Sequence, residues 1–437
     1  MADAGTLVST SSQYVNAYTG DVTAFDTNNT LTSTMKTYYD TLLLTNIREK
    51  AVFAQLGKKE ALPAGRGRTV EWRKWNTLPD AAQLTEGVIP TGKKFGQSSM
   101  TVALTQHGIY VAVSDLLDLH AIDPVIVGAT EEIGASLTRT YDKLVRNTLL
   151  TGGHVIYADA VDKTNDYAFV SSPATRTALS FDAATFCGLS PDMIAKAVTR
   201  LEKTNTPYYE GSTYVAVAHP SVIYDLRRHP EWIDVHKYAA VEEIFNGEVG
   251  QLNGVRFIRS TLAPVIRAAG LIAAADTLTV KTAISSSTTT VAVTEAISSD
   301  EATALAGRKI FIGDSANTIS SVTSGTAGSA TLTVGTAVTT VAADTVIYPG
   351  EAAKKGGAVY PTMFFGKDAF AVVDPDGAQV ETIFKSRQQI GGPLEQFSTV
   401  GGKFETATKL IYPERMVTIE CCSSYSGTDK DNITINA

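Results

Sequence analysis

The sequence predicts a mixed α+β fold with a small all-β domain inserted into it. Three observations lead to this prediction: a long basic hairpin over residues 61–110, one long amphipathic helix over 123–152, and a Thr/Ser-rich stretch of short alternating strands over 271–352. Helical and strand periodicities occur on both sides of that stretch, so neither an all-α nor an all-β class accounts for the whole chain.

The composition fits a large globular protein. The chain has 437 residues, of which 44% are hydrophobic and 19% are charged, which excludes global disorder. The net charge of −8 excludes a polycation that coats nucleic acid. No run of about 18 apolar residues is present, so no membrane span is expected. The three cysteines, Cys187, Cys421 and Cys422, are too few for a disulfide framework, and we expect reduced thiols.

The first 60 residues are expected to form an extended arm and a helix. Residues 1–34 are rich in Thr, Ser and Asn and offer little that a core could bury. From about 34 to 53, apolar residues recur at helical spacing, and Gly57 and Pro63 end this pattern.

A long hairpin follows the first helix. Its arms, 61–75 and 95–113, have the alternating pattern of strands, and a polar tip with two prolines and two glycines separates them. A two-stranded hairpin of this length has too little hydrophobic surface to be stable alone. We therefore expect it to lie on a neighbouring copy of the same protein.

The hairpin also carries a cluster of basic and aromatic residues. We predict that these residues dock on the next subunit: Arg66, Arg68, Trp72, Arg73, Lys74, Trp75, Lys93 and Lys94. Strand alternation places Arg73 and Trp75 on one face, and Trp72 and Lys74 then lie on the other. Direct contact with nucleic acid, with a tryptophan stacked on bases, is the alternative. Docking is favoured because an acidic chain supplies complementary patches, and complementary charge fixes the register between partners.

The clearest helix in the sequence spans 123–152. Asp123 is a suitable N-cap, and Pro124 occupies the first helical position, where a missing N–H has no cost. A continuous apolar stripe follows, and Gly152 and Gly153 end the helix. The element would span roughly 40 Å, so we expect it to be the spine of a domain.

The remaining chain divides into an α/β unit and an insert. Residues 187–270 and 353–385 alternate between helical and strand patterns, which predicts a compact α/β unit. Inside the Thr/Ser-rich insert, strands are predicted at 277–282, 290–294, 309–312, 330–334 and 345–348. After the α/β unit, residues 403–421 predict two further apolar strands.

A Gly-Asp-Ser sequence at 313–315 resembles the nucleophile block of one lipase and esterase family. That chemistry needs a histidine to accept the serine proton, and no histidine follows His236. A tight turn accounts for this sequence better than a nucleophile at Ser315. We therefore predict no catalytic residue and do not expect an enzyme.

Three histidines, His219, His229 and His236, lie close together in the sequence with several carboxylates nearby. Two or three histidines with a carboxylate can bind zinc, but these spacings fit no metal-binding signature. A polar region with ordinary charge pairs is favoured. Neither a metal nor a cofactor is predicted.

Taken in order, these parts resemble those of the major capsid proteins of tailed bacteriophages. The resemblance is stronger to the subgroup found in short-tailed phages of the coliphage N4 kind. The insert has no counterpart in it. The similar stretches are 35–40, 52–57, 62–72, 391–403 and 407–417.

The resemblance implies an HK97-like phage capsid fold. In that fold, residues 1–60 would be the N-terminal arm with the first helix, and 61–110 would be the extended loop. The other domains would be a peripheral domain of 111–186 and 386–437 with the spine helix, an axial domain of 187–270 and 353–385, and the inserted β-domain of 271–352.

The resemblance also implies a structural function. Many copies would self-assemble, as hexamers and pentamers, into an icosahedral head shell that encloses double-stranded DNA without sequence specificity. A scaffolding protein, a portal and a decoration protein are the implied partners, with assembly in the host cytoplasm and a final place in the virion. The alternative is a tail or surface adhesin that uses the insert and forms trimers or fibres.

Overall fold

The structure is a computed structural model. It describes residues 51–62, 67–76, 78–81, 83, 86, 89, 92–115, 125–232, 251–313, 315–375, 381–386, 396–425 and 427. The predicted arm over 1–34, nearly all of the first predicted helix, and Asp123 and Pro124 lie outside the described residues.

The chain forms two compact units. Unit 1 consists of Met1–Thr151 and Phe370–Ile411, and unit 2 of Gly152–Ala369 and Tyr412–Ala437. Among the described residues no helix is long and apolar enough to cross a bilayer.

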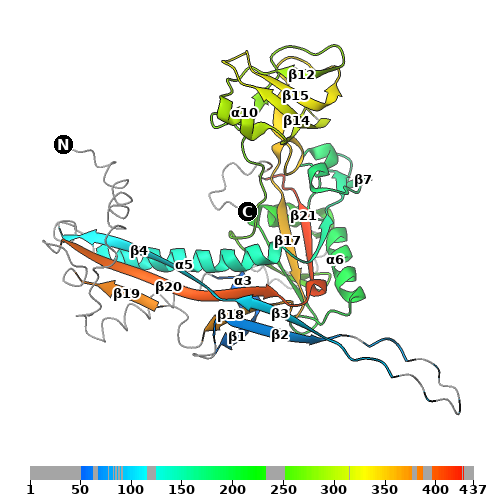
Figure 1. Cartoon of the computed structure of the whole chain (residues 1–437). Helices are drawn as coiled ribbons and strands as arrows, with labels where there is room; N and C mark the ends of the chain where they lie inside the picture. The colour runs from blue at the N-terminus through cyan, green and yellow to red at the C-terminus, as the bar shows by residue number, and fades with distance from the viewer. Residues whose placement is uncertain are drawn as a thin grey trace. The chain divides into compact units, whose positions relative to one another are not determined.

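Unit 1 is built on a five-stranded sheet with a long helix packed on it (Figure 1). The strand order is β1-β18-β20-β19, and β4 pairs with β20. The helix, α5, spans Val125–Leu150, inside the predicted range, and its apolar stripe buries Ile133 and Leu137 against β20. The strands are β1 (Lys58–Leu62), β4 (Thr105–Ser114), β18 (Phe370–Pro375), β19 (Glu381–Lys385) and β20 (Phe397–Leu410).

The predicted hairpin, with arms at 61–75 and 95–113, is present only in part as a separate two-stranded sheet, because β1 pairs with β18 and β4 pairs with β20 in the five-stranded sheet instead. Strands β2 (Thr69–Trp75) and β3 (Gln97–Ala103) pair antiparallel along their full length, with Trp72 opposite Met100. A single helical turn, α3 (Phe53–Leu56), precedes β1.

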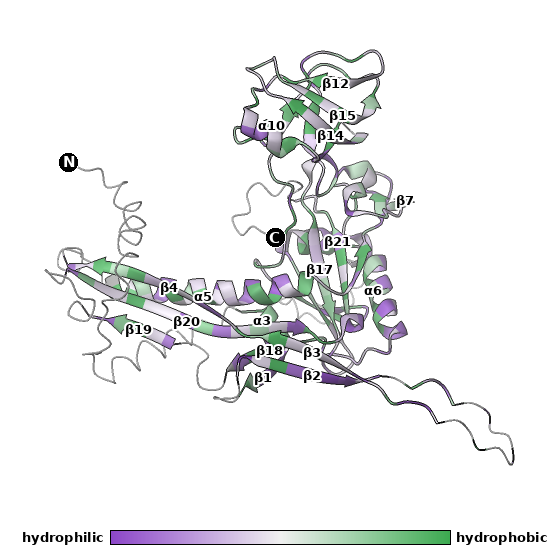
Figure 2. Ribbon diagram, in the orientation of Figure 1, coloured by the Kyte–Doolittle hydropathy of each residue, from purple (hydrophilic) through white to green (hydrophobic). Residues whose placement is uncertain are grey.

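Unit 2 contains a six-stranded mixed sheet in the order β5-β21-β17-β8-β10-β9. Its central strands are buried at every residue, as expected for strands covered on both faces. Figure 2 shows both hydrophobic and hydrophilic residues along α6, which lays its apolar face on this core. The strands are β5 (His154–Tyr157), β8 (Tyr214–Ala218), β9 (Gln251–Leu252), β10 (Val255–Arg259), β17 (Tyr360–Phe365) and β21 (Met416–Cys421), and the helices are α6 (Pro191–Lys203) and α7 (Pro220–Arg227).

The units divide the chain differently from the predicted domains. Residues 152–186 and 412–437, expected in the peripheral domain, belong to unit 2, because β5 and β21 join the sheet of the predicted axial domain. Residues 370–385, expected in the axial domain, belong to unit 1, because β18 pairs with β1 and β20.

Smaller elements complete unit 2. Strands β6 (Ala160–Asp162) and β7 (Ala168–Ser171) form a two-stranded sheet. Short 3₁₀ turns occur at η2 (Arg176–Ala178), η3 (Ala183–Thr185), η4 (Lys354–Gly356) and η5 (Pro413–Arg415).

The insert region forms a second six-stranded sheet in unit 2, in the order β11-β16-β13-β14-β15-β12. The two end strands are joined as well. Lys281 N donates a hydrogen bond to Ala292 O at 2.9 Å, and Thr294 N donates to Thr279 O at the same distance. The sheet therefore closes into a small barrel around its own apolar core. Its strands are β11 (Leu278–Thr279), β12 (Thr288–Ala292), β13 (Lys309–Ile312), β14 (Ser315–Thr323), β15 (Thr331–Val338) and β16 (Val346–Pro349).

The barrel also contains a helix, α10 (Ser299–Leu305), so the prediction that the insert is all-β is wrong at this point. Ser298 and Glu301 form a capping box at its start, a signal that the sequence carries. Ala302 and Leu305 pack into the barrel core.

Candidate functional site

The base of the hairpin is anchored on the sheet of unit 1. The inward side chains of β2, Val70 and Trp72, pack on a cluster that includes the buried Leu104 and Val373. The Trp72 indole Nε1 also donates a hydrogen bond to Glu60 Oε2 at 2.5 Å. These contacts fix the hairpin base within its own subunit.

Arg68 belongs to the same base. Its guanidinium Nη2 donates to Leu104 O at 3.0 Å, and Leu104 N donates to Arg68 O at 2.8 Å. Two residues of the predicted docking cluster, Arg68 and Trp72, thus make contacts inside the subunit. Arg66, a third member, lies outside the described residues.

The other face of β2 points away from this anchor. The predicted alternation is confirmed: Arg73 and Trp75 are exposed, whereas Trp72 and Lys74 are half-buried. The structure thus separates the predicted cluster into an inner set and an outer set.

An aromatic pair dominates the outer face. The ring of Trp75 stacks on that of Phe95, with centroids 4.4 Å apart and planes at 14°. Both side chains are largely exposed, at 59% and 58%. The sequence analysis did not include Phe95 in the site, because only the register of the two arms brings its ring onto that of Trp75. Stacked exposed aromatics are a typical anchor of a protein interface.

Basic residues surround this pair. Arg73 Nε lies 3.2 Å from Glu71 Oε1, but both side chains are exposed, so the pair contributes only about 0–1 kcal/mol. Arg73 can therefore exchange this contact for one with a partner at little cost. Lys93 and Lys94 are also exposed. We call Arg73, Trp75, Lys93, Lys94 and Phe95 the outer hairpin face.

The candidate nucleophile Ser315 begins a strand directly after a turn. It is the first residue of β14 and pairs with Ile312, and Gly313 between them has a φ of 59°. Only glycine adopts this backbone conformation at no cost. The tight turn expected here is what the structure shows.

The candidate metal ligands have other roles. His219 caps α7: its Nδ1 accepts a hydrogen bond from Ser221 N at 3.3 Å, and burial lowers the pKa of His219 to about 4. His229 is buried against the ring of Tyr167, and burial lowers its pKa as well. His236 lies outside the described residues. Within the part of the chain that the structure describes, no group of three His, Cys, Asp or Glu side chains could hold a metal ion.

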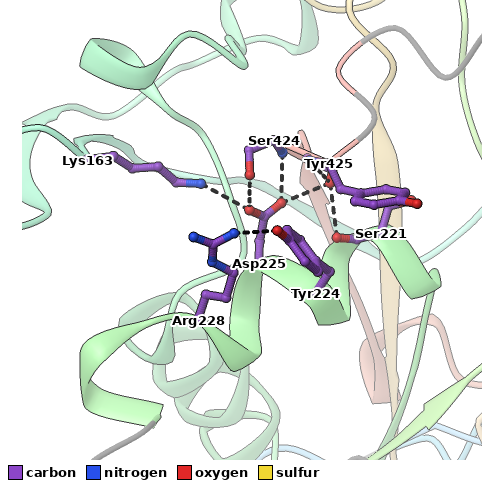
Figure 3. A network of polar contacts seen from close by, with 8 residues as sticks. Lys163, Ser221, Tyr224, Asp225, Arg228, Ser424 and Tyr425 are labelled. Carbon is purple, nitrogen blue, oxygen red and sulfur yellow. Dashed lines mark hydrogen bonds and ion pairs between the residues drawn. The ribbon is translucent and has the colours of Figure 1, made fainter.

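A polar network that the sequence did not reveal holds the segment that follows β21 (Figure 3). Asp225 Oδ1 pairs with Lys163 Nζ at 3.0 Å. Asp225 Oδ2 accepts hydrogen bonds from Ser423 Oγ at 2.9 Å and from Ser424 N at 2.8 Å. One buried carboxylate on α7 thus joins the β6–β7 hairpin to the segment after β21, residues 422–425, which we call the strap.

One arginine side chain of the barrel contacts both chain segments at its point of attachment. The guanidinium of Arg308 donates to Ala269 O and Gly270 O, each at 2.8 Å. It also forms a two-bond pair with Glu351, both distances being 2.8 Å. We call the segments 269–270 and 350–351 the neck. Arg308 ties both neck segments to the barrel.

Unit 1 contains a buried carboxylate with a structural role. Asp142 Oδ1 on α5 accepts a hydrogen bond from Ala54 N at 3.2 Å, at the start of α3. Burial raises the pKa of Asp142, and the backbone N–H groups of residues 52–54 oppose that rise. Arg146, one turn further along α5, is also buried, with 1% of its surface exposed.

No protein family matches the sequence, and no curated protein matches it. Solved structures of phage capsids are similar in fold. The capsid of cyanophage P-SCSP1u is 12% identical with a TM-score of 0.48, over 86% of this chain and 89% of that one. The capsid of Ralstonia phage GP4 is 13% identical with a TM-score of 0.47, over 86% and 92%. The acid-stable capsid of Helicobacter pylori bacteriophage KHP30 is 9% identical with a TM-score of 0.49, over 84% and 88%.

Proposed function

We propose that the protein is the major capsid protein of a tailed bacteriophage, of the kind found in N4-like short-tailed phages. Many copies form hexamers and pentamers that close into the icosahedral head shell around double-stranded DNA. The observation that carries this proposal is the hairpin. It is anchored at its base in its own subunit and displays an exposed aromatic pair among basic residues on its outer face.

The hairpin cannot be explained by the stability of a single subunit. In the described part of the chain its two strands pair with no third strand, and two large aromatic side chains remain in water. Burial of these side chains against a partner would contribute about 1.5–3 kcal/mol of favourable free energy for each one. In a shell every subunit docks its own hairpin on one neighbour and receives the hairpin of another. Many contacts of modest free energy therefore give a stable assembly.

The remaining parts have proposed places in the shell. The sheet of unit 1 with α5 forms the peripheral part, and the mixed sheet of unit 2 forms the axial part that meets its copies around five-fold and six-fold axes. The barrel is an added domain on the mixed sheet of unit 2 and has no part in the minimal shell fold. Assembly takes place in the host cytoplasm with a scaffolding protein and a portal, and the finished protein resides in the virion. The role is structural, with no enzymatic activity.

The double variant Trp75→Ala/Phe95→Ala tests the proposal. Interface anchors of this kind contribute about 2 kcal/mol or more when buried, so we expect the variant to remain a folded subunit that no longer forms shells. Ser98→Ala, at an exposed position that pairs with Lys74 on the opposite face of the same hairpin, is the matched control and should assemble normally. Negative-stain electron microscopy and light scattering, with and without the scaffolding protein, measure the outcome.

Two results would contradict the proposal at different levels. Normal shells from the double variant would exclude the outer hairpin face as the docking surface. Trimers or fibres from the unmodified protein under both conditions would exclude the shell and favour an adhesin.

A further inference from the structure

Two of the three cysteines lie side by side in the core of unit 2. Cys422 N donates a hydrogen bond to Cys187 O at 2.7 Å, and both residues are fully buried. A backbone hydrogen bond between neighbouring segments places their Cα atoms about 5–6 Å apart. That separation is within the range that a disulfide bridges.

The third cysteine is placed differently. Cys421 is the last residue of β21, so its side chain points to the opposite face from that of Cys422. Its thiol donates a hydrogen bond to Tyr360 O at 3.2 Å. The chain therefore supplies one candidate pair, Cys187 with Cys422, and a neighbouring thiol that serves as an internal control.

Burial makes the thiols of Cys187 and Cys422 unreactive while the strap is closed. Burial raises the pKa of both thiols, and a charge on Cys187 raises the pKa of Cys422 further. A neutral thiol is a poor nucleophile. Oxidation thus requires a transient opening of the strap, which begins at Cys422 and is held by Asp225.

We propose that Cys187 and Cys422 form an intramolecular disulfide when the folded protein meets a low-molecular-weight disulfide such as oxidised glutathione. The thiolate of one cysteine attacks the S–S bond of the oxidant, and one glutathione leaves as its thiolate. The second cysteine, as its thiolate, attacks the mixed disulfide and displaces the other glutathione. The protein loses two protons and two electrons, and the oxidant becomes two thiols.

The bond would fasten the strap to the segment that precedes α6. Its timing rests on the proposed function, because a virion leaves a reducing cytoplasm for an oxidising medium. A shell protein would then assemble with free thiols and gain the cross-link after release from the host.

Thiol counting on the purified, unassembled protein tests the proposal. The protein is incubated with oxidised glutathione, quenched with acid, unfolded, and titrated with Ellman's reagent. We expect the count to fall from three thiols per chain to one, and peptide mapping to find Cys187 linked to Cys422. Cys421→Ser should form the same bond and leave no free thiol.

Three retained thiols after prolonged incubation, a bond that involves Cys421, or a bond between two chains would each overturn the proposal. The primary measurement uses the unmodified protein, so it does not depend on the folding of a variant. It also needs no shell, so its failure leaves the proposed function intact.

Discussion

Replacing Asp142 by alanine is expected to destabilise unit 1 by about 2–4 kcal/mol. The carboxylate accepts a hydrogen bond from Ala54 N at 3.2 Å, and the N–H groups of the two preceding residues also face it. Alanine leaves these donors buried without an acceptor, and each unsatisfied buried donor costs about 1–3 kcal/mol. The substitution also removes the cost of burying the carboxylate, so the net loss is smaller than the sum over the three donors. The turn α3 would detach from α5.

Asp142→Asn is the matched control. The amide keeps an oxygen that accepts hydrogen bonds, and it carries no charge. Burial raises the pKa of Asp142, which means that the folded state favours the uncharged form of this side chain. We therefore expect the free energy of unfolding of the Asn variant to stay within about 1 kcal/mol of that of the unmodified protein.

The pH dependence of the stability of unit 1 tests the same site in a second way. A carboxyl whose pKa is raised above its ordinary value of 3.8 binds a proton more tightly in the folded state. Its contribution to stability therefore grows as the pH falls through the raised pKa towards 3.8, and shrinks as the pH rises. Asp142→Asn removes this group, so the stability of unit 1 should vary less with pH.

Hydrogen exchange of α5 in increasing urea measures both effects, because it reports on unit 1 alone. Unchanged protection of α5 in Asp142→Ala would refute the capping role. An Asn variant as unstable as the Ala variant would show that charge, and not the acceptor oxygen, holds α3.

Two further predictions concern unit 2 and the neck. Gly366→Ala would place a Cβ 2.1 Å from Thr206 Cγ2 and 3.0 Å from Pro207 O, so it should lower the melting temperature through an overpacking cost of about 1–3 kcal/mol. Gly128→Ala, where a Cβ meets nothing within 4 Å, is its control in calorimetry and should be neutral or stabilising by up to about 1 kcal/mol; equal losses in both variants would contradict the steric reason. Arg308→Ala removes the hydrogen bonds to both neck segments, so amide exchange there should rise at least about tenfold, while the barrel core stays protected. Lys309→Ala, at an exposed neighbouring position, should leave exchange at the neck unchanged, and equal rates in the two variants would exclude the clamp.

Local patterns in the sequence predicted the elements well. The long helix was predicted over 123–152 and spans Val125–Leu150, because its apolar stripe is continuous. The barrel strand predicted at 309–312 has those bounds. Both elements have a local signal, a continuous apolar stripe in the helix and a short run of apolar residues in the strand.

Pairing between distant segments was not predictable in this way. β5 pairs with β21 although more than 250 residues separate them, and this pairing moved both segments out of the expected domain. Asp225 and the strap meet for the same reason. The outer hairpin face was predicted in part: alternation identified Trp75, but only the register of the two arms brings Phe95 onto it.

The neck makes the barrel separable from the unit that carries it. Just before and after the neck, Ile266 and Val359 are paired by two backbone hydrogen bonds of 2.8 and 2.9 Å, so the chain leaves and returns at one place. A short turn could bridge that gap, and so could a different folded domain whose own ends lie close together. Because the two end strands of the barrel are hydrogen-bonded to each other, its described strands leave no open edge for pairing with another chain. In the proposed shell, the same position could therefore carry a foreign domain in many copies, each at a defined spacing.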